Sequence, residues 1–209
     1  LYSSAASDVY KRQKNEFANG RARLNASVFF NDYTDQQINQ FINGTFTVVN
    51  ADSEIFGGEI ELNTVTANDL FFDVSVGFLN TEVKNPTNSS LLGEELPYAP
   101  DLTGRIAVRK DWELANDARI TGEIEGQYAS GRWFNLANTG GKGPSHFVSN
   151  AQLSYQFGSE QQYRLSLWGR NIFGEEWITF ISPGGTQAGA DAATLSLPRT
   201  YGLSFRADF

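Results

Sequence analysis

The chain has 209 residues, and its 16 lysine and arginine residues against 24 aspartate and glutamate residues give a formal net charge of −8. This acidity argues against a protein that grips the phosphate backbone of a nucleic acid. The sequence contains no cysteine and one histidine, His146, which excludes disulfide frameworks, thiolate zinc sites and paired-histidine metal sites.

The first residues follow no clear hydrophobic period. Residues 1–13 resemble translated sequencing-adapter read-through, so we expect them to be a non-native segment and residues 14–209 to be the folded part; the alternative is an ordinary polar N-terminal arm. Because the sequence has no methionine, we expect it to be a fragment or a processed product. No apolar run approaches the roughly 18 to 20 residues that a membrane-spanning helix needs.

From residue 21 onward, apolar and polar residues alternate with the period of two that is typical of β-strands. In the first such run, Leu24 and Val28 fall on one face while Arg23 and Asn25 fall on the other. The alternation predicts eight strands and no convincing helix. The expected strands lie at residues 21–31, 59–66, 70–78, 102–109, 119–128, 146–157, 163–170 and 197–209.

Within these spans, Arg199 is the one charged residue on the apolar face. Alternation alone leaves open whether that face points into the core of a soluble barrel or outward into lipid. The connections favour lipid, because short ones near 67–69, 113–117 and 159–162 alternate with long ones near 34–45, 83–98, 131–144 and 173–193. The pattern predicts an all-β fold, an antiparallel up-and-down transmembrane β-barrel fragment of about eight strands.

Aromatic residues gather near both ends of the expected strands. This placement is typical of the two interfacial belts of a membrane barrel, although aromatics also favour strands in general. Near the short turns they are Trp112, Phe157, Tyr163 and Phe209, and near the long loops they are Phe30, Phe78, Tyr128 and Phe147.

Several stretches resemble a known family. The most specific is LWGRNIF at 167–173 with Glu175, Glu176 and Trp177, which is similar to an Asn-Leu-Phe-like turn followed by acidic and aromatic residues. The others are KNEF at 14–17, FFNDY at 29–33, GGEIEL at 57–62, LPYAP at 96–100 and the closing run PRTYGLSFRADF at 198–209. Together they resemble the C-terminal part of the barrel of TonB-dependent outer-membrane receptors.

The resemblance implies a location in the bacterial outer membrane, in contact with its lipid, and active import of a scarce, bulky nutrient such as a siderophore, cobalamin or a glycan. It also implies partners outside this sequence: a plug domain, a TonB-contacting segment that engages the TonB complex, and most of the roughly 22 strands of such a barrel. Phe209 resembles the terminal aromatic that the barrel-assembly machinery recognises; the alternative is an ordinary interfacial aromatic.

The candidate ligand-binding residues are aromatics in the expected loops. They either stack on a ligand or pack the loops and anchor the interface. These residues are Tyr98, Trp133, Phe134, Trp177 and Phe180. Charged residues on the polar face are expected to form cross-strand pairs rather than a substrate path. They are Arg105, Arg109, Arg119, Glu123, Glu125, Arg164 and Arg170.

We expect no enzyme activity, cofactor or metal site. His146 has no cysteine or second histidine to work with, and residues 140–143 (GGKG) lack the context of a phosphate-binding loop, so they are expected to form a flexible loop. The acidic residues at 52, 54, 94 and 95 are expected to be solvated.

Two other functions stay open: a self-contained small outer-membrane barrel, and a soluble β-barrel that binds an apolar ligand inside. A backbone ladder joining residues 21–33 to 195–209 would indicate closure, since eight strands can close. Otherwise we expect a curved, open sheet with those two segments as its edges.

Overall fold

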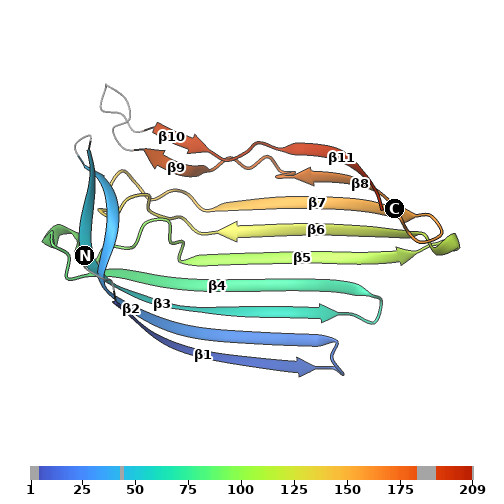
Figure 1. Cartoon of the computed structure of the whole chain (residues 1–209), viewed down its shortest axis with the longest axis horizontal. Helices are drawn as coiled ribbons and strands as arrows, with labels where there is room; N and C mark the ends of the chain where they lie inside the picture. Colours follow the sequence, from blue (N-terminus) through green and yellow to red (C-terminus); the bar gives the residue numbers. More distant parts are fainter. Residues whose placement is uncertain (1–4, 43–44, 183–191, 209) are drawn as a thin grey trace.

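The computed structural model describes residues 5–42, 45–182 and 192–208 and shows one antiparallel sheet of nine strands (Figure 1). In sheet order they are β1 (Ala5–Phe17), β2 (Ala22–Ile42), β3 (Thr45–Val65), β4 (Leu70–Lys84), β5 (Leu102–Glu113), β6 (Arg119–Ala129), β7 (His146–Phe157), β8 (Tyr163–Arg170) and β11 (Thr200–Ala207). Strands β9 (Ile178–Ser182) and β10 (Ala192–Leu195) form a separate two-stranded hairpin.

The sheet is all-β, up-and-down and open, as the alternation predicts. All eight expected strands occur, and each of β1 to β7 is followed in the sheet by its successor along the chain. In the described part of the chain the sheet begins at β1 and ends at β11, so these edge strands do not pair and the small closed barrel is ruled out. The one-turn helices η1 (Ser89–Leu91) and η2 (Ala115–Asp117) lie in connections.

Two expectations about the N-terminal half are wrong. Residues 21–33 are not an edge, because β1 pairs with β2 from Ala5 opposite Thr34 to Phe17 opposite Ala22. Strand β1 therefore uses residues that we set aside as adapter-derived, although their origin stays a prediction. Residues 34–45 are also not a simple loop: β2 and β3 continue their ladder to Ile42 opposite Thr45, with a register shift between Tyr33 and Gln36.

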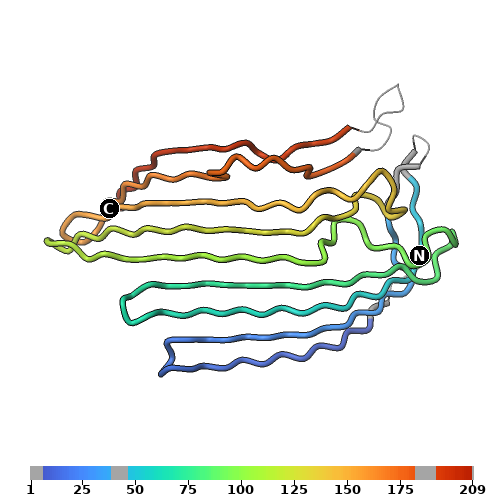
Figure 2. The backbone as a smooth tube through the Cα atoms, turned by 180° about the vertical axis from the view of Figure 1, so that it is seen from behind, coloured from blue at the N-terminus to red at the C-terminus, as the bar shows by residue number. Residues whose placement is uncertain are grey.

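Short and long connections lie at opposite ends of the sheet (Figures 1 and 2). The short-turn end holds the turns at 18–21, 66–69, 114–118 and 158–162. The loop end holds the connections 85–101 and 130–145 together with the β9–β10 hairpin. Within the described ranges, neither helical turn is long and apolar enough to cross a membrane.

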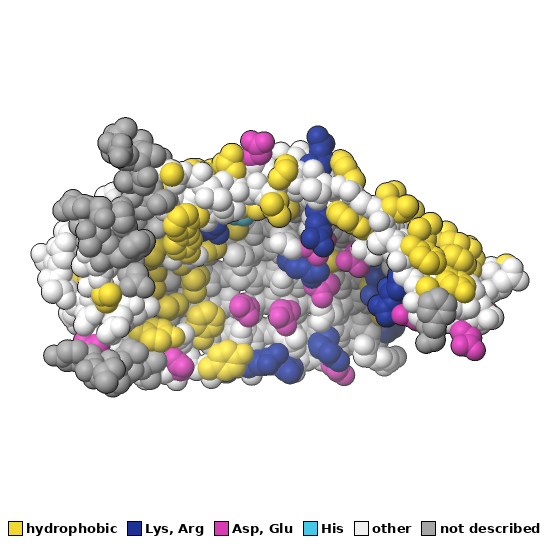
Figure 3. Space-filling view, turned by 45° about the horizontal axis from the view of Figure 1, so that its top comes forward, with side chains coloured by type: hydrophobic (Ala, Val, Ile, Leu, Met, Phe, Trp, Pro, Cys, Tyr) yellow, Lys and Arg dark blue, Asp and Glu magenta, His cyan; other side chains and the backbone are white. Residues whose placement is uncertain are grey.

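The apolar side chains point outward. Ile60 is 54% exposed, Ile124 62% and Leu203 69%, and each belongs to the apolar set of alternating positions on its strand. The residues at the other alternating positions line the concave face, where charged side chains gather (Figure 3). In the part of the chain that the structure describes, the apolar side chains of the strands therefore form no central core, and the outward orientation expected for them is confirmed. The soluble barrel with an apolar interior is wrong for the same reason.

Aromatic rings form a ladder on the outer face near the short-turn end. Ring centroids are 5.1 Å apart for Tyr155 and Phe157, 5.4 Å for Phe157 and Tyr163, and 6.1 Å for Tyr163 and Phe205. Rings at this spacing attract one another and bury one another's faces. A continuous belt of this kind crosses three neighbouring strands, which is the arrangement that the aromatic placement in the sequence predicts.

The buried apolar cluster lies at the loop end rather than between the strands. It joins Ala51 of β3, Val83 of β4, Leu91 of η1 and Leu136 of the β6–β7 connection. Leu136 is 1% exposed although its connection has no regular secondary structure. The loops are consequently packed onto the strand ends and onto each other.

Candidate functional site: an aromatic cluster at the loop end

Three aromatic side chains from separate segments meet at the loop end. Tyr98 lies in the β4–β5 connection, Phe134 in the β6–β7 connection and Phe180 in β9. The ring centroid of Tyr98 is 5.7 Å from that of Phe134, edge to face, and 6.4 Å from that of Phe180, with the two rings nearly parallel. We call Tyr98, Phe134, Phe180 and Arg132 the aromatic cluster.

Arg132 completes the aromatic cluster and was missed in the sequence. Its guanidinium carbon lies 5.9 Å from the Tyr98 centroid and 5.7 Å from the Phe134 centroid. A guanidinium at this distance is attracted to the electron-rich ring face and keeps donors free for an anion. The sequence Arg132-Trp133-Phe134, a cation beside two aromatic residues in a long loop, is the feature that could have predicted this role of Arg132.

Phe134 is 7% exposed, whereas Tyr98 is 42% and Phe180 48% exposed. Phe134 is therefore the base of the aromatic cluster, and the other two rings present surface to solvent. Burial raises the pKa of the Tyr98 hydroxyl, and the positive charge of Arg132 opposes this only in part. Tyr98 consequently stays a neutral hydrogen-bond donor across the ordinary pH range.

Polar contacts hold the β4–β5 and β6–β7 connections together. The backbone N–H of Tyr98 donates to the carbonyl of Trp133 at 2.8 Å. The ammonium of Lys142 lies 2.9 Å from a carboxylate oxygen of Glu95 and 3.0 Å from one of Asp101. Residues 140–143 (GGKG), which we expected to form a flexible loop, are thus held to the β4–β5 connection by the ion pairs of Lys142.

These contacts shift the pKa of Lys142. Burial alone would lower it, but the hydrogen bonds that the ammonium donates to Glu95 and Asp101 and the negative charges of these carboxylates outweigh burial, so the pKa lies above its ordinary value. The ammonium is therefore charged wherever the loops are folded at neutral pH.

The five predicted aromatics do not all join. The ring of Trp177 stacks instead on His146, with centroids 4.7 Å apart and an interplanar angle of 3°. Trp133 contributes its backbone carbonyl to Tyr98. Phe209 lies outside the described residues.

Asn171 closes a turn within residues 167–177, the stretch of the sequence that resembles the family most specifically. The residue is 4% exposed and has a φ of 49°, which interrupts the strand between β8 and β9. Its side chain donates to the carbonyl of Glu175 at 2.7 Å and accepts from the N–H of Glu175 at 2.9 Å, while its own N–H donates to Asn150 Oδ1 at 3.1 Å. This closed turn directs the chain toward Phe180 at the loop end.

The concave face carries some of the cross-strand ion pairs that the mixed charges predict, whereas no ion pair of Glu123, Arg164 or Arg170 occurs among the described residues. Arg105 of β5 contacts Asp73 of β4 and lies 2.9 Å from Glu125 of β6. Arg109 differs from expectation, because its guanidinium lies over the Phe71 ring at 4.4 Å and its nearest carboxylate, 3.8 Å away, is on its own strand.

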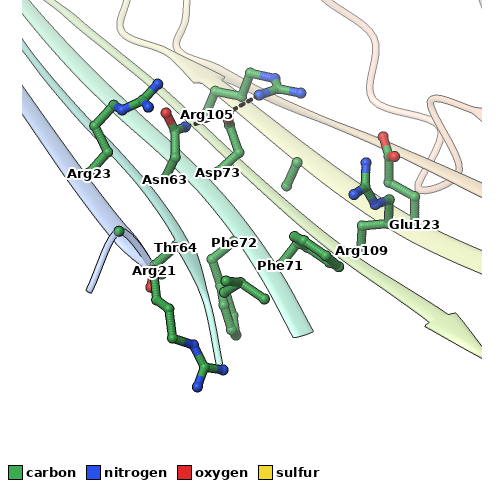
Figure 4. Close-up of a pocket in the computed structure, with 13 residues that line it drawn as sticks. Arg21, Arg23, Asn63, Thr64, Phe71, Phe72, Asp73, Arg105, Arg109 and Glu123 are labelled. Atoms are coloured by element: carbon green, nitrogen blue, oxygen red, sulfur yellow. Dashed lines mark hydrogen bonds and ion pairs between the residues drawn. The ribbon is translucent and has the colours of Figure 1, made fainter. Parts of the chain in front are cut away.

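A recess of about 490 Å³ opens on this face near the short-turn end (Figure 4). Its rim carries both signs of charge, with Arg23, Asp73, Arg109 and Glu123 from four different strands. This surface suits contact with a polar protein segment more than with an apolar ligand.

The acidic residues that we expected to be solvated have protein partners. Glu95 pairs with Lys142. Glu94 accepts from the Asn138 amide at 2.6 Å, and Asp52 accepts from the Asn85 amide at 3.0 Å. In the described ranges, no group of three or more histidine, aspartate or glutamate side chains could hold a metal ion.

Solved structures share this fold. The ferric yersiniabactin uptake receptor FyuA from Yersinia pestis superposes with a TM-score of 0.80 at 15% identity, over 98% of this chain and 30% of that one. The copper transporter OprC gives 0.77 at 16% identity, over 99% and 31%, and the ferric citrate transporter FecA gives 0.74 at 19% identity, over 99% and 31%. The chain thus spans about three tenths of these proteins.

Among curated proteins, no sequence matches the chain. Residues 10–172, by contrast, match the family described as TonB dependent receptor-like, beta-barrel. This match covers most of the nine-stranded sheet, from within β1 to the Asn171 turn. The chain therefore belongs to the TonB dependent receptor-like β-barrel family.

Proposed function

We propose that the chain is the C-terminal part of the barrel wall of an outer-membrane receptor that imports a scarce, bulky nutrient with energy delivered through TonB. Receptors of this family are outer-membrane β-barrels that interact with TonB. In this proposal the outward face meets lipid, and the concave face meets a plug domain and the translocated ligand. The edges β1 and β11 continue into the remaining strands, and the barrel-assembly machinery inserts the whole.

The aromatic cluster carries the proposal. Tyr98 and Phe180 expose their rings at the loop end, and Arg132 supplies a positive charge beside them. Rings offer large contact area at a low cost in conformational entropy, and a guanidinium adds directional donors for an anion. Packing of Phe134 and the ion pairs of Lys142 hold this surface in place before a ligand arrives.

Of the three nutrient classes, this chemistry favours a siderophore. A ferric siderophore complex presents anionic oxygens and planar groups, which match a guanidinium flanked by rings. The names of the similar structures support the choice, since they describe uptake of ferric yersiniabactin and ferric citrate. Copper, named for another of them, is the second candidate cargo.

The experiment measures binding to the full-length receptor in detergent. The probes are a ferric catecholate complex, ferric citrate, cobalamin and cupric ion. We expect a ferric complex to bind, and we expect Arg132→Ala and Phe180→Ala each to raise its Kd at least tenfold. Tyr163→Ala, in the aromatic belt at the other end, is the matched control and should leave the Kd unchanged. Equal affinities in all variants would contradict the proposed site.

A further inference from the structure

A hollow of about 660 Å³ lies on the outward, apolar face of the sheet, where it crosses β5 to β8 and β11. Its floor includes small residues from three neighbouring strands. Ala151 of β7 stands directly opposite Gly169 of β8, and Gly122 of β6 is opposite Leu153, two residues further along β7. Because these positions carry almost no side chain, the apolar surface is recessed there and raised around them.

Aromatic rings form the walls of this hollow. A Cβ built on Gly122 would lie 3.0 Å from the Trp112 ring, and one built on Gly169 would lie 3.0 Å from the Tyr201 ring. The two rings therefore lean against glycine backbone, which limits the positions that they can adopt. The hollow is a shaped feature of the wall rather than a gap between mobile side chains.

A single charge stands at the edge of the hollow. Lys110 is the one charged residue on the outward parity of β5 to β8, and its ammonium donates to the carbonyl of Asn68 in the β3–β4 turn. Among the described residues no carboxylate pairs with it. A lysine facing lipid costs about 2 to 4 kcal/mol at mid-bilayer and much less near the interface, so the side chain is expected to extend toward the headgroups.

We propose that this hollow binds one glycerophospholipid of the periplasmic leaflet, with an acyl chain along Ala151 and Gly169 and the phosphate on the ammonium of Lys110. Short turns face the periplasm in such barrels, and Lys110 reaches the turn at Asn68. The apolar lining matches an acyl chain, and the uncompensated ammonium matches a phosphodiester anion. The inference rests on the proposed outer-membrane location.

The test is native mass spectrometry of the full-length receptor released from detergent micelles containing phosphatidylglycerol, or diacylglycerol with the same acyl chains. We expect one phosphatidylglycerol to be retained and diacylglycerol to be lost. Ala151→Trp fills the hollow and Lys110→Gln removes the charge, so each should lower retention at least fivefold. Lys110→Arg should restore it, and Ile60→Trp, outward on β3 and away from the hollow, should keep it.

Two results would overturn the phospholipid site: equal retention in all variants, or retention of diacylglycerol that matches phosphatidylglycerol and ignores Lys110→Gln. A dimer of the receptor that Ala151→Trp dissociates would assign the hollow to a second copy instead. Membrane fractionation is run in parallel. A receptor that is absent from the outer membrane would refute the proposed function, whereas a correctly located receptor without bound lipid would refute only this inference.

Discussion

Adjacent residues on one strand meet opposite environments in this protein. On β4, Val74 has the outward, apolar parity and Ser75 points to the concave face, where it stands opposite Glu61 of β3 and Arg105 of β5. The two positions are consecutive on one strand and share depth and backbone geometry, whereas Val74 stands opposite Leu62 and Ile106. A pair of matched substitutions therefore compares the two faces of the sheet.

We predict that Val74→Arg costs about 2 to 4 kcal/mol of unfolding free energy if residue 74 lies near mid-bilayer, and that Ser75→Arg costs far less. The first guanidinium must enter hydrocarbon, while the second enters a polar, hydrated face where Glu61 attracts it and Arg105 repels it. Urea titration of the full-length receptor in lipid vesicles measures both. Similar losses at the two positions would contradict the orientation of the sheet.

The positive charge of Lys142 holds two loops together. Its pKa is raised in the folded protein, so its ion pairs contribute their full stability below the ordinary lysine value of about 10.4 and lose it only as the pH rises through the higher folded-state pKa. We therefore predict that the contacts of Lys142 with Glu95 and Asp101 persist from neutral to mildly alkaline pH and separate only at strongly alkaline pH.

The measurement is fluorine NMR of the full-length receptor labelled with fluorotryptophan, with the Trp133 signal identified by Trp133→Phe. The signal should hold its position to about pH 10 and move above it. In Lys142→Gln it should already be displaced at pH 7. A signal that moves below pH 9 in the wild type but not in Lys142→Gln would argue against this account.

Single residues were predictable to the extent that local pattern governs them. The parity of Leu24, Ile60 and Leu203 follows from alternation alone, because a strand sends successive side chains to opposite faces. The meeting of Tyr98 with Phe180 depends on loops whose course no period describes. Trp177 was expected in the same role, yet it lies against His146.

At the level of strands, aromatic rings repeatedly lie over glycines of the neighbouring strand. On the outer face Phe78 covers Gly58 and Phe147 covers Gly126, and on the concave face Trp168 covers Gly202. The ring shields backbone that glycine leaves bare, and the glycine provides the space for the ring. The strands are thus fitted to one another pair by pair, in addition to their ladder hydrogen bonds.

Gly126 provides a test of this fit. A Cβ at Gly126 would lie 2.6 Å from the Phe147 ring, whereas one at the outward Gly104 would meet nothing closer than 3.8 Å. We predict that Gly126→Val destabilises the full-length receptor by about 1 to 3 kcal/mol, because the ring must leave its position. Gly104→Val should cost much less, and Phe147→Ala should recover part of the loss at residue 126. Urea titration in vesicles again provides the values.

Strand identity was predictable where alternation was clean, and boundaries were not. Residues 34–45 lack alternation that marks a strand, yet pairing between β2 and β3 extends through most of them, because backbone hydrogen bonds need no particular side chain. Strand β1 was missed because its composition suggested a non-native origin. Lys110 was missed because the apolar run on β5 was ended at Val108, one outward position too early.

For the whole molecule, the two unpaired edges decide the behaviour of the chain on its own. The outer edges of β1 and β11 carry backbone groups without ladder partners in the described structure, and hydrocarbon offers none. We predict that residues 1–209 alone aggregate on refolding with lipid vesicles, whereas the full-length receptor inserts as a monomer. Sedimentation with the vesicles and resistance to protease distinguish the two outcomes. A protease-resistant monomer of the isolated chain would mean that the sheet closes in lipid.

The shared cluster of Leu91 and Leu136 has a consequence for how such a receptor can diversify. These leucines come from different connections, yet each fills space that the other leaves. A change of volume in one connection creates a void or a clash beneath the other, so the pair must vary together. The connections at the loop end would then change together as a matched set rather than one at a time.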